Sequence, residues 1–225
     1  MDSEYIDVIE NSEIVLEESN KIFYLFIKRL FDIISSLIGM FFLIPIAIII
    51  KILYVINKDY DSIFYTQKRI GLNGKFIYIL KFRTMIPNAD EVLKELLKDP
   101  KYKKEWDRNQ KLENDPRITK IGKLLRKTSL DELPQFINVI KGDMSLIGPR
   151  PLVEGELDAH EGNHELYESV RPGISGWWAV KGRSDVTYEE RLELEYYYVK
   201  HMGLFLDIKI IFKTIGAVFL KKGAK

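Results

Sequence analysis

The longest apolar run of the chain lies in residues 22–57, where hydrophobic side chains follow one another almost without interruption. Between Leu30 and Ile50 only Asp32 and two serines interrupt it. Twenty-one residues in a helix would measure about 31 Å, which is enough to cross a bilayer. Pro45 lies inside the run, and proline kinks or breaks a helix. We therefore expect a re-entrant membrane helix hairpin in residues 22–57, broken at Pro45.

Basic residues flank this apolar segment on both sides. Lys and Arg favour the cytoplasmic side of a membrane, so a hairpin with both ends in the cytoplasm satisfies both flanks. Asp32 would be costly deep in lipid and is expected near the interface, paired with a cation such as Arg29. The alternative is a buried helix in a soluble nucleotide-binding protein. The flanking cations are Lys21, Lys28, Arg29, Lys51 and Lys58.

The remaining pattern predicts an α+β fold. Residues 1–21 form an acidic N-terminal arm, and residues 58–225 are expected to form a mainly helical cytoplasmic catalytic domain. Within this domain, residues 62–85 predict a small β-hairpin around a glycine-containing turn. Residues 87–114 are strongly charged and predict a helical insertion. Residues 201–222 predict an amphipathic helix that can lie on the membrane surface or dock against the core.

The composition excludes several kinds of chemistry. The chain has no cysteine, which rules out disulfides, zinc–thiolate sites and thiol nucleophiles. A formal net charge of +1 gives no reason to expect nucleic acid as a partner. His160 and His164 are spaced as on one helix face, but Gly162 weakens a helix there, so we interpret both as surface residues. A bound metal is expected to be a hard cation with oxygen ligands, such as Mg²⁺.

Two adjacent carboxylates, Asp131 and Glu132, stand where a helix is predicted to begin. One interpretation is a capping box in which Ser129 caps the helix and Glu132 reaches back to it, although Pro134 would then lie slightly too deep. The other interpretation is chemical. A carboxylate at a helix N-terminus stays ionised, and it can attack phosphorus or hold a divalent cation. The local pattern leaves both interpretations open.

Candidate phosphate-binding cations lie on both sides of this pair. Arg126 precedes Asp131 by five residues, and Arg150 follows in a loop rich in glycine and proline. Lys81 and Arg83 lie where the second predicted strand ends. They either contact phosphate or simply line a solvated strand face.

A second glycine-containing loop spans residues 171–183. Arg171 and Arg183 stand at its two ends and can grip a phosphate through paired hydrogen bonds. Trp177 and Trp178 lie between them. These rings can stack on a base, lie at the membrane interface or pack in the core.

Several of these segments occur together, in this order, in one family. The chain resembles the bacterial sugar transferases called polyprenyl-phosphate hexose-1-phosphate transferases, the small monotopic phosphoglycosyl transferases, over residues 28–215. The charged insertion is most similar to the branch that transfers galactose or glucose phosphate. The matching segments are residues 28–32, 67–71, 81–85, 115–119, 125–135, 141–151, 171–173 and 182–183.

The resemblance implies a reaction. A sugar-1-phosphate moves from a UDP-sugar to polyprenyl (undecaprenyl) phosphate, and UMP is released. This is the first membrane step of surface glycan synthesis, at the cytoplasmic face of the bacterial inner membrane. The implied partners are these two substrates and the membrane lipid, without nucleic acid, and a homodimer is left open. The competing hypothesis is a catalytically silent membrane-anchored scaffold of the same fold.

The resemblance also implies roles for residues. Asp131 matches the nucleophile that forms a covalent phosphosugar intermediate, and Glu132 matches its partner. Mg²⁺ is the implied cofactor, with Asp131 as its ligand. Lys81 and Arg126 match phosphate-binding residues of the family. To these we add, as further candidates for binding the donor phosphates, Arg150, Arg171 and Arg183.

Four positions depart from the family pattern. Ile44 stands where serine is common before the helix-breaking proline, and Glu195 stands where aspartate is common. Ala179 replaces the usual glutamine, and Lys181 replaces a small polar residue. We therefore expect a different interaction at the bend and a difference in donor recognition.

Overall fold

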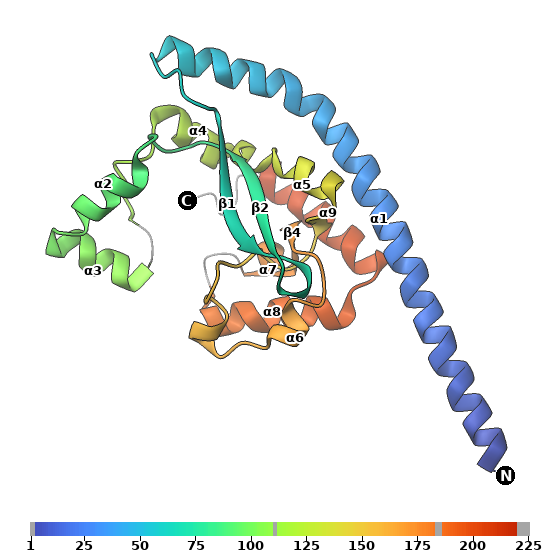
Figure 1. Ribbon diagram of the computed structural model, residues 1–225. Coiled ribbons are helices and arrows are strands. Elements are labelled where there is room, and N and C mark those ends of the chain that lie inside the picture. Colours follow the sequence, from blue (N-terminus) through green and yellow to red (C-terminus); the bar gives the residue numbers. More distant parts are fainter. Residues whose placement is uncertain (1–2, 110–111, 183–185, 220–225) are drawn as a thin grey trace.

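The computed structural model describes residues 3–109, 112–182 and 186–219. Its dominant element is α1 (Ser3–Ile56), a long helix that curves over one side of the molecule (Figure 1). The first part of α1 extends away from the other elements, while its second half covers them. The coarse expectation of a mixed helix and strand fold with one long apolar N-terminal helix is confirmed.

The two faces of α1 differ sharply. Its inner face is buried against the body through residues spaced four, seven or eight apart, namely Tyr24, Asp32, Ser36, Leu43, Ile50 and Tyr54. This is the spacing of one helix face. Large apolar side chains on the outer face are exposed, among them Phe26 at 66% and Phe41 at 74%. The segment Asn20–Ile56 is long and apolar enough to cross a membrane by length and composition alone.

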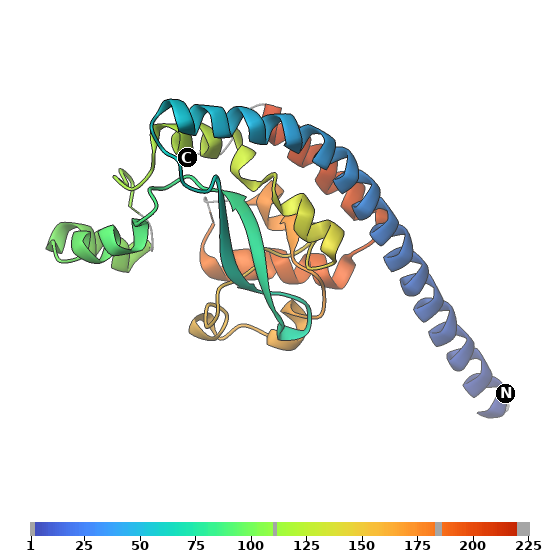
Figure 2. The same cartoon turned by 45° about the horizontal axis from the view of Figure 1, so that its top comes forward.

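The predicted break at Pro45 is wrong, because α1 continues through this residue as one helix. Proline removes one backbone hydrogen bond and bends a helix more readily than it ends one when packing holds both sides. Here Leu43 and Ile50 both lie in the same hydrophobic cluster of the body. The predicted re-entrant hairpin is not seen, and α1 is a single curved helix (Figure 2).

Asp32 is buried, with 3% of its surface exposed, but its partners differ from the predicted one. It accepts hydrogen bonds from Ser145 Oγ at 2.7 Å and from the backbone N–H of Leu146 at 3.0 Å. Arg29 donates instead to the carbonyls of Val139 and Ile140, at 2.7 and 3.0 Å. Both side chains thus anchor α1 to the body, and the predicted pairing between them is wrong.

Two small sheets lie under α1. The predicted hairpin is present: β1 (Phe64–Ile70) and β2 (Phe76–Phe82) pair antiparallel, with Tyr65 opposite Lys81. A second sheet, not predicted, consists of β3 (Ser145–Ile147) and β4 (Gly173–Ser175), which pair in parallel. This sheet places the loop that carries Arg150 next to the loop that begins at Arg171.

Helices surround these sheets. The charged insertion contains α2 (Ala89–Leu96) and α3 (Pro100–Asn109), which project from the body (Figure 1). The C-terminal helix α9 (Leu204–Phe219) carries exposed Phe205 and Phe212 beside Lys209 and Lys213, and residues 220–222 of the predicted amphipathic helix lie outside the described part. The other α-helices are α4 (Lys120–Thr128), α5 (Gln135–Lys141), α6 (His164–Tyr167), α7 (Trp177–Lys181) and α8 (Tyr188–His201).

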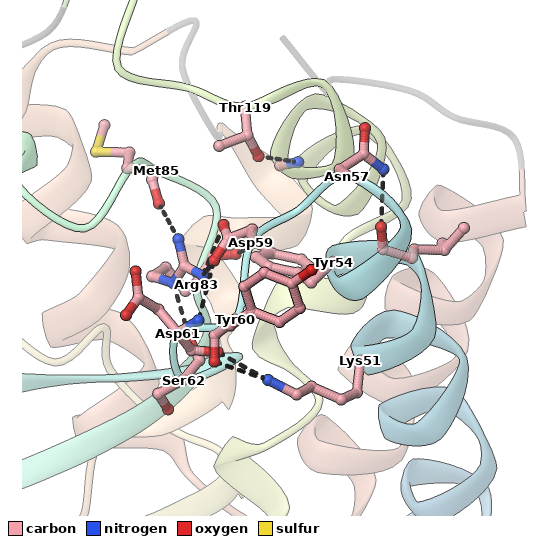
Figure 3. A network of polar contacts seen from close by, with 12 residues as sticks. Lys51, Tyr54, Asn57, Asp59, Tyr60, Asp61, Ser62, Arg83, Met85 and Thr119 are labelled. Carbon is pink, nitrogen blue, oxygen red and sulfur yellow. Dashed lines mark hydrogen bonds and ion pairs between the residues drawn. The ribbon is translucent and has the colours of Figure 1, made fainter.

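A closed polar cluster joins the end of α1 to the hairpin (Figure 3). We call Tyr54, Asp59, Ser62 and Arg83 the α1-end cluster. Arg83 donates twice to the Asp59 carboxylate, at 2.8 and 2.9 Å, and to the carbonyls of Ser62 and Met85, at 2.7 and 3.1 Å. The Tyr54 hydroxyl donates to the Arg83 carbonyl. Arg83 is therefore committed to structure, and the alternative in which it contacts phosphate is not supported.

Candidate active site

A sharp change of chain direction positions Asp131 and Glu132. Ser129 ends α4 in the left-handed region, with φ 56°, and a short 3-10 helix (Leu130–Glu132) follows. Pro134 then precedes the first residue of α5. The capping box is wrong, because Ser129 terminates one helix and its side chain caps nothing. The proline instead fits because it stands outside the regular helix.

The carboxylate pair lies near cations from two elements, β2 and α4. Lys81 on β2 forms an ion pair with Glu132 at 2.9 Å. Burial raises the pKa of the Asp131 carboxyl above its ordinary value, and the neighbouring charge of Glu132 adds to this, whereas Lys81 and Arg126 oppose it. A three-residue helix has little dipole, so the predicted helix-dipole stabilisation is replaced by these two cations. Arg126 itself is held by its Nε, which donates to Thr84 Oγ1 at 3.0 Å.

The site adjoins the apolar helix directly. Leu130 and Leu133 flank the two carboxylates in sequence and pack on a hydrophobic cluster that contains Leu43 and Ile50 of α1. On its opposite face, α1 carries the exposed apolar residues described above. The segment that carries the two carboxylates therefore packs on the inner face of α1, opposite its exposed apolar side chains.

A cavity of about 130 Å³ is lined by Glu132 of the carboxylate pair, by β4 and by the loop that follows β3. Three cations line its wall: Lys81, Arg150 and Arg69. Arg69 was not predicted from the sequence to bind phosphate. The glycines at 148, 173 and 176 let the two loops approach closely, since a Cβ at any of them would collide with the backbone opposite. The other lining residues are Ile79, Glu132, Gln135, Pro151, Ile174, Ser175, Trp178, Ala179 and Glu195.

Three residues that line this cavity carry polar atoms without partners. Arg69 Nη1, Trp178 Nε1 and Glu195 Oε2 are buried and make no hydrogen bond with the described part of the chain. Glu195 on α8 is 1% exposed, and its other oxygen accepts the Arg150 backbone N–H at 3.1 Å. Burial raises the pKa of Glu195 to about 7. The sequence marked Glu195 only as a departure from a family pattern, because α8 carries four acids, at positions 189, 190, 193 and 195, and gives no sign of which one is buried.

Of the remaining candidates, Arg150 lines the cavity but Arg171 does not. Arg171 donates from its Nε to the Gly142 carbonyl at 2.8 Å and so supports the end of α5. Arg183 lies outside the described residues. Trp177 is a core residue, 7% exposed and stacked on Tyr197 at 5.7 Å between ring centres.

The two histidines are surface residues, as predicted. His160 stacks on Tyr188 with ring centres 3.5 Å apart. His164 Nδ1 lies 2.7 Å from Glu168 and its Nε2 lies 2.8 Å from Asp158, and these two contacts raise its pKa. Neither histidine lines the cavity beside the carboxylate pair.

The residues present fit a magnesium ion only with help from substrate. In the described part of the chain, no group of three or more His, Cys, Asp or Glu side chains could hold a metal. Magnesium, however, is commonly held by one or two carboxylates while water and substrate phosphates complete its coordination. Asp131 and Glu132 offer such hard oxygen donors beside a cavity lined by cations.

Comparison with known proteins finds a family profile and several relatives that agree with one another. The sequence profile described as bacterial sugar transferase matches residues 23–221. The chain is 46% identical over 200 residues to a UDP-galactose-lipid carrier transferase of Erwinia amylovora, covering 88% of this chain and 42% of that protein. An undecaprenyl-phosphate galactose phosphotransferase of Salmonella typhimurium gives the same identity and the same two coverages.

A shorter relative matches nearly end to end. The exopolysaccharide production protein ExoY of Rhizobium meliloti is 44% identical over 198 residues, covering 88% of this chain and 87% of that protein. This chain therefore spans less than half the length of the first two relatives but most of the length of the third.

Proposed function

Because this chain belongs to the bacterial sugar transferase family, we propose that it transfers a sugar-1-phosphate from a UDP-sugar to polyprenyl phosphate at a membrane. The observation that carries this proposal is the pair Asp131 and Glu132, set among cations at the mouth of a cavity and directly beneath an apolar helix. The names of the two relatives from Erwinia amylovora and Salmonella typhimurium suggest the two substrate classes, a UDP-sugar and undecaprenyl phosphate.

The proposed reaction has two displacement steps. A carboxylate oxygen of Asp131 attacks the phosphorus that carries the sugar, the bond to the UMP oxygen breaks, and UMP leaves with the bonding electrons. An oxygen of polyprenyl phosphate then attacks the same phosphorus, and Asp131 is released as a carboxylate. This is covalent catalysis, which divides one difficult substitution into two easier ones.

The cations account for how an anionic nucleophile meets an anionic donor. Lys81 and Arg126 favour the ionised form of Asp131, and Arg150 extends the positive charge along the cavity wall. Such prearranged charges commonly give the largest share of transition-state stabilisation. When bound, Mg²⁺ would be held by Asp131 and Glu132 and would neutralise charge on the phosphates.

The proposed membrane placement follows from the two faces of α1. The apolar segment has 37 residues, which in a helix measure about 56 Å, far more than the roughly 30 Å of a hydrocarbon core. Its inner face stays packed on the body of the protein from Tyr24 to Tyr54. We propose that α1 lies obliquely in one leaflet with its outer face in lipid, so that both ends remain cytoplasmic and the lipid phosphate reaches Asp131 from the inner membrane.

Trapping the intermediate tests the reaction. Purified protein would be incubated with UDP-galactose, UDP-glucose and related donors plus Mg²⁺, and its intact mass measured before polyprenyl phosphate is added. We expect a mass increase equal to one sugar phosphate, its loss on adding the acceptor, and UMP release. Asp131→Asn should form no adduct and lose activity by at least about a thousandfold, while its thermal stability stays unchanged.

Asp107→Asn on the exposed insertion is the matched control and should behave like the wild type. UMP release that persists in Asp131→Asn would reject the covalent step. No release with any donor would favour the catalytically silent scaffold. Reaction of an N-terminal tag with an external label would overturn the proposed membrane placement, which needs both ends of α1 in the cytoplasm.

A further inference from the structure

Three residues that line the cavity each bury one polar atom that has no hydrogen-bond partner among the described residues: Arg69 Nη1, Trp178 Nε1 and Glu195 Oε2. All three belong to residues of one cavity wall. We call them the cavity-end cluster. Buried polar groups in folded proteins are nearly always hydrogen-bonded, and leaving one unpaired costs free energy. Three of them beside one cavity indicate a ligand that supplies the missing partners.

The kinds of atom restrict that ligand. Arg69 and Trp178 are donors, since neither a guanidinium nor an indole accepts a hydrogen bond. The ionised Glu195 carboxylate is an acceptor only. A phosphate offers acceptors to the first two but is repelled by the third, and a metal cation suits only the third. The complementary group is one edge with two acceptors and a donor.

The imide edge of uracil has this pattern, because its N3–H lies between two carbonyl oxygens. Cytosine carries an acceptor at N3 and an amino donor in place of one carbonyl, so it would oppose both the carboxylate and one donor. The size agrees, since a cavity of about 130 Å³ approaches the roughly 150 Å³ that holds a benzene ring in an engineered protein.

The neighbouring contacts explain why the three atoms stay available. The second oxygen of Glu195 is already held by the Arg150 backbone N–H at 3.1 Å, which fixes the carboxylate. The ring faces of Trp178 meet Arg150 and Arg191, whose guanidinium carbons lie 5.6 and 4.9 Å from the ring centre. Trp178 therefore presents its N–H edge rather than a stacking face.

We propose that Arg69, Trp178 and Glu195 read the uracil ring of the donor nucleotide and select it over cytosine. The proposal rests on the proposed function, in which the donor is a UDP-sugar. The pyrophosphate then lies along the same cavity toward Lys81 and Glu132, both of which line it. The three atoms are buried, so the cavity wall has to open around them as the base enters.

Equilibrium dialysis of the full chain in detergent micelles tests this without turnover. UMP, CMP and inorganic pyrophosphate would be compared, in the wild type and in Asp131→Asn, which removes the covalent step. We expect UMP to bind at least about tenfold more tightly than CMP, since one mispaired buried hydrogen bond costs that much or more. Equal binding of UMP and CMP would overturn the proposal, as would pyrophosphate binding as tightly as UMP.

Variants assign the selectivity to residues. In Glu195→Gln the amide can still accept from Arg150 but turns a donor toward the base, so UMP binding should fall about tenfold or more and the UMP-to-CMP ratio should collapse toward one. Trp178→Phe keeps the ring, loses the N–H, and should weaken UMP binding. Glu156→Gln changes a neighbouring carboxylate that does not line the cavity, and it should leave the ratio unchanged.

An unchanged ratio in Glu195→Gln would reject the assignment even if Trp178→Phe has lost affinity. The result also separates the two proposals. UMP selectivity without a covalent adduct in the wild type keeps the base-reading role and rejects the reaction. If the protein forms the adduct but binds UMP and CMP equally, the proposed reaction is kept and the base-reading role is rejected.

Discussion

The α1-end cluster and the cavity-end cluster are built from the same residue types but differ in how they are satisfied. Each contains an arginine, a carboxylate and an aromatic side chain. Around Arg83 the donors reach Asp59 and two carbonyls, and the group is closed (Figure 3). Around Arg69 and Glu195 a donor and an acceptor remain unpaired beside a cavity. Pairing, rather than residue type, separates a structural cluster from a binding one.

The first prediction concerns a variant that disrupts the α1-end cluster. Arg83→Met should lower the free energy of unfolding by about 3–5 kcal/mol, because it leaves the Asp59 charge without its buried partner and two carbonyls without donors. Arg150→Met is the matched substitution next to the cavity-end cluster. It should alter the free energy of unfolding by less than about 1 kcal/mol, since the Arg150 side chain is exposed. Urea unfolding in detergent micelles measures both.

Equal losses in these two variants would contradict the comparison, since both arginines would then serve structure. A measurement of ligand binding tests the role of Arg150 directly. Arg150→Met should weaken pyrophosphate binding, because Arg150 lines the cavity, while its unfolding midpoint stays close to that of the wild type.

The second prediction concerns the free-energy cost of burying the Glu195 carboxylate in the cavity-end cluster. Glu195 is 1% exposed, and burial raises its pKa from 4.5 to about 7 despite Arg150 and Arg191. The folded state therefore binds the proton more tightly than the unfolded chain, and stability falls as pH rises from about 4.5 to 7. At about 1.36 kcal/mol per pKa unit, the loss is about 3 kcal/mol.

Glu195→Gln cannot ionise and should escape this loss. Its advantage in unfolding free energy should be near zero at about pH 4.5 and about 3 kcal/mol at about pH 8. Tyr167, which also senses this charge, stays neutral in that range. Glu154→Gln on the exposed surface is the control and should show no such trend. A variant less stable than the wild type at pH 8 would mean that the carboxylate is structurally paired.

The third and smallest effect on stability tests the carboxylate pair. Lys81 and Glu132 have side chains 24% and 41% exposed, so solvent screens their attraction. Lys81→Met should therefore change unfolding free energy by less than about 1 kcal/mol. Its activity should fall at least tenfold, because a cation that favours ionised Asp131 is lost. Lys98→Met in the insertion, paired with Glu95 at 2.7 Å, should change neither quantity appreciably.

The sequence by itself determined the features that depend on neighbours along the chain. The apolar run in residues 22–57, the hairpin around residues 71–74 and the charged insertion follow from local pattern, and each is present as helix or strand. The motif around Asp131 and Glu132 also identified the family, because its residues are contiguous. Lys81 and Arg126 were named as its companions, and both act on the Asp131 carboxyl.

Only the tertiary structure decided which polar groups are paired. Arg83 and Arg150 look alike in sequence, yet one is bound by Asp59, 24 positions away, and the other lines a cavity. Glu195 is one acid among several in α8, and its burial depends on a contact with Arg150, 45 positions away. The continuity of α1 through Pro45 likewise depends on its packing against the body. Burial and pairing arise between distant segments, so a local pattern carries no record of them.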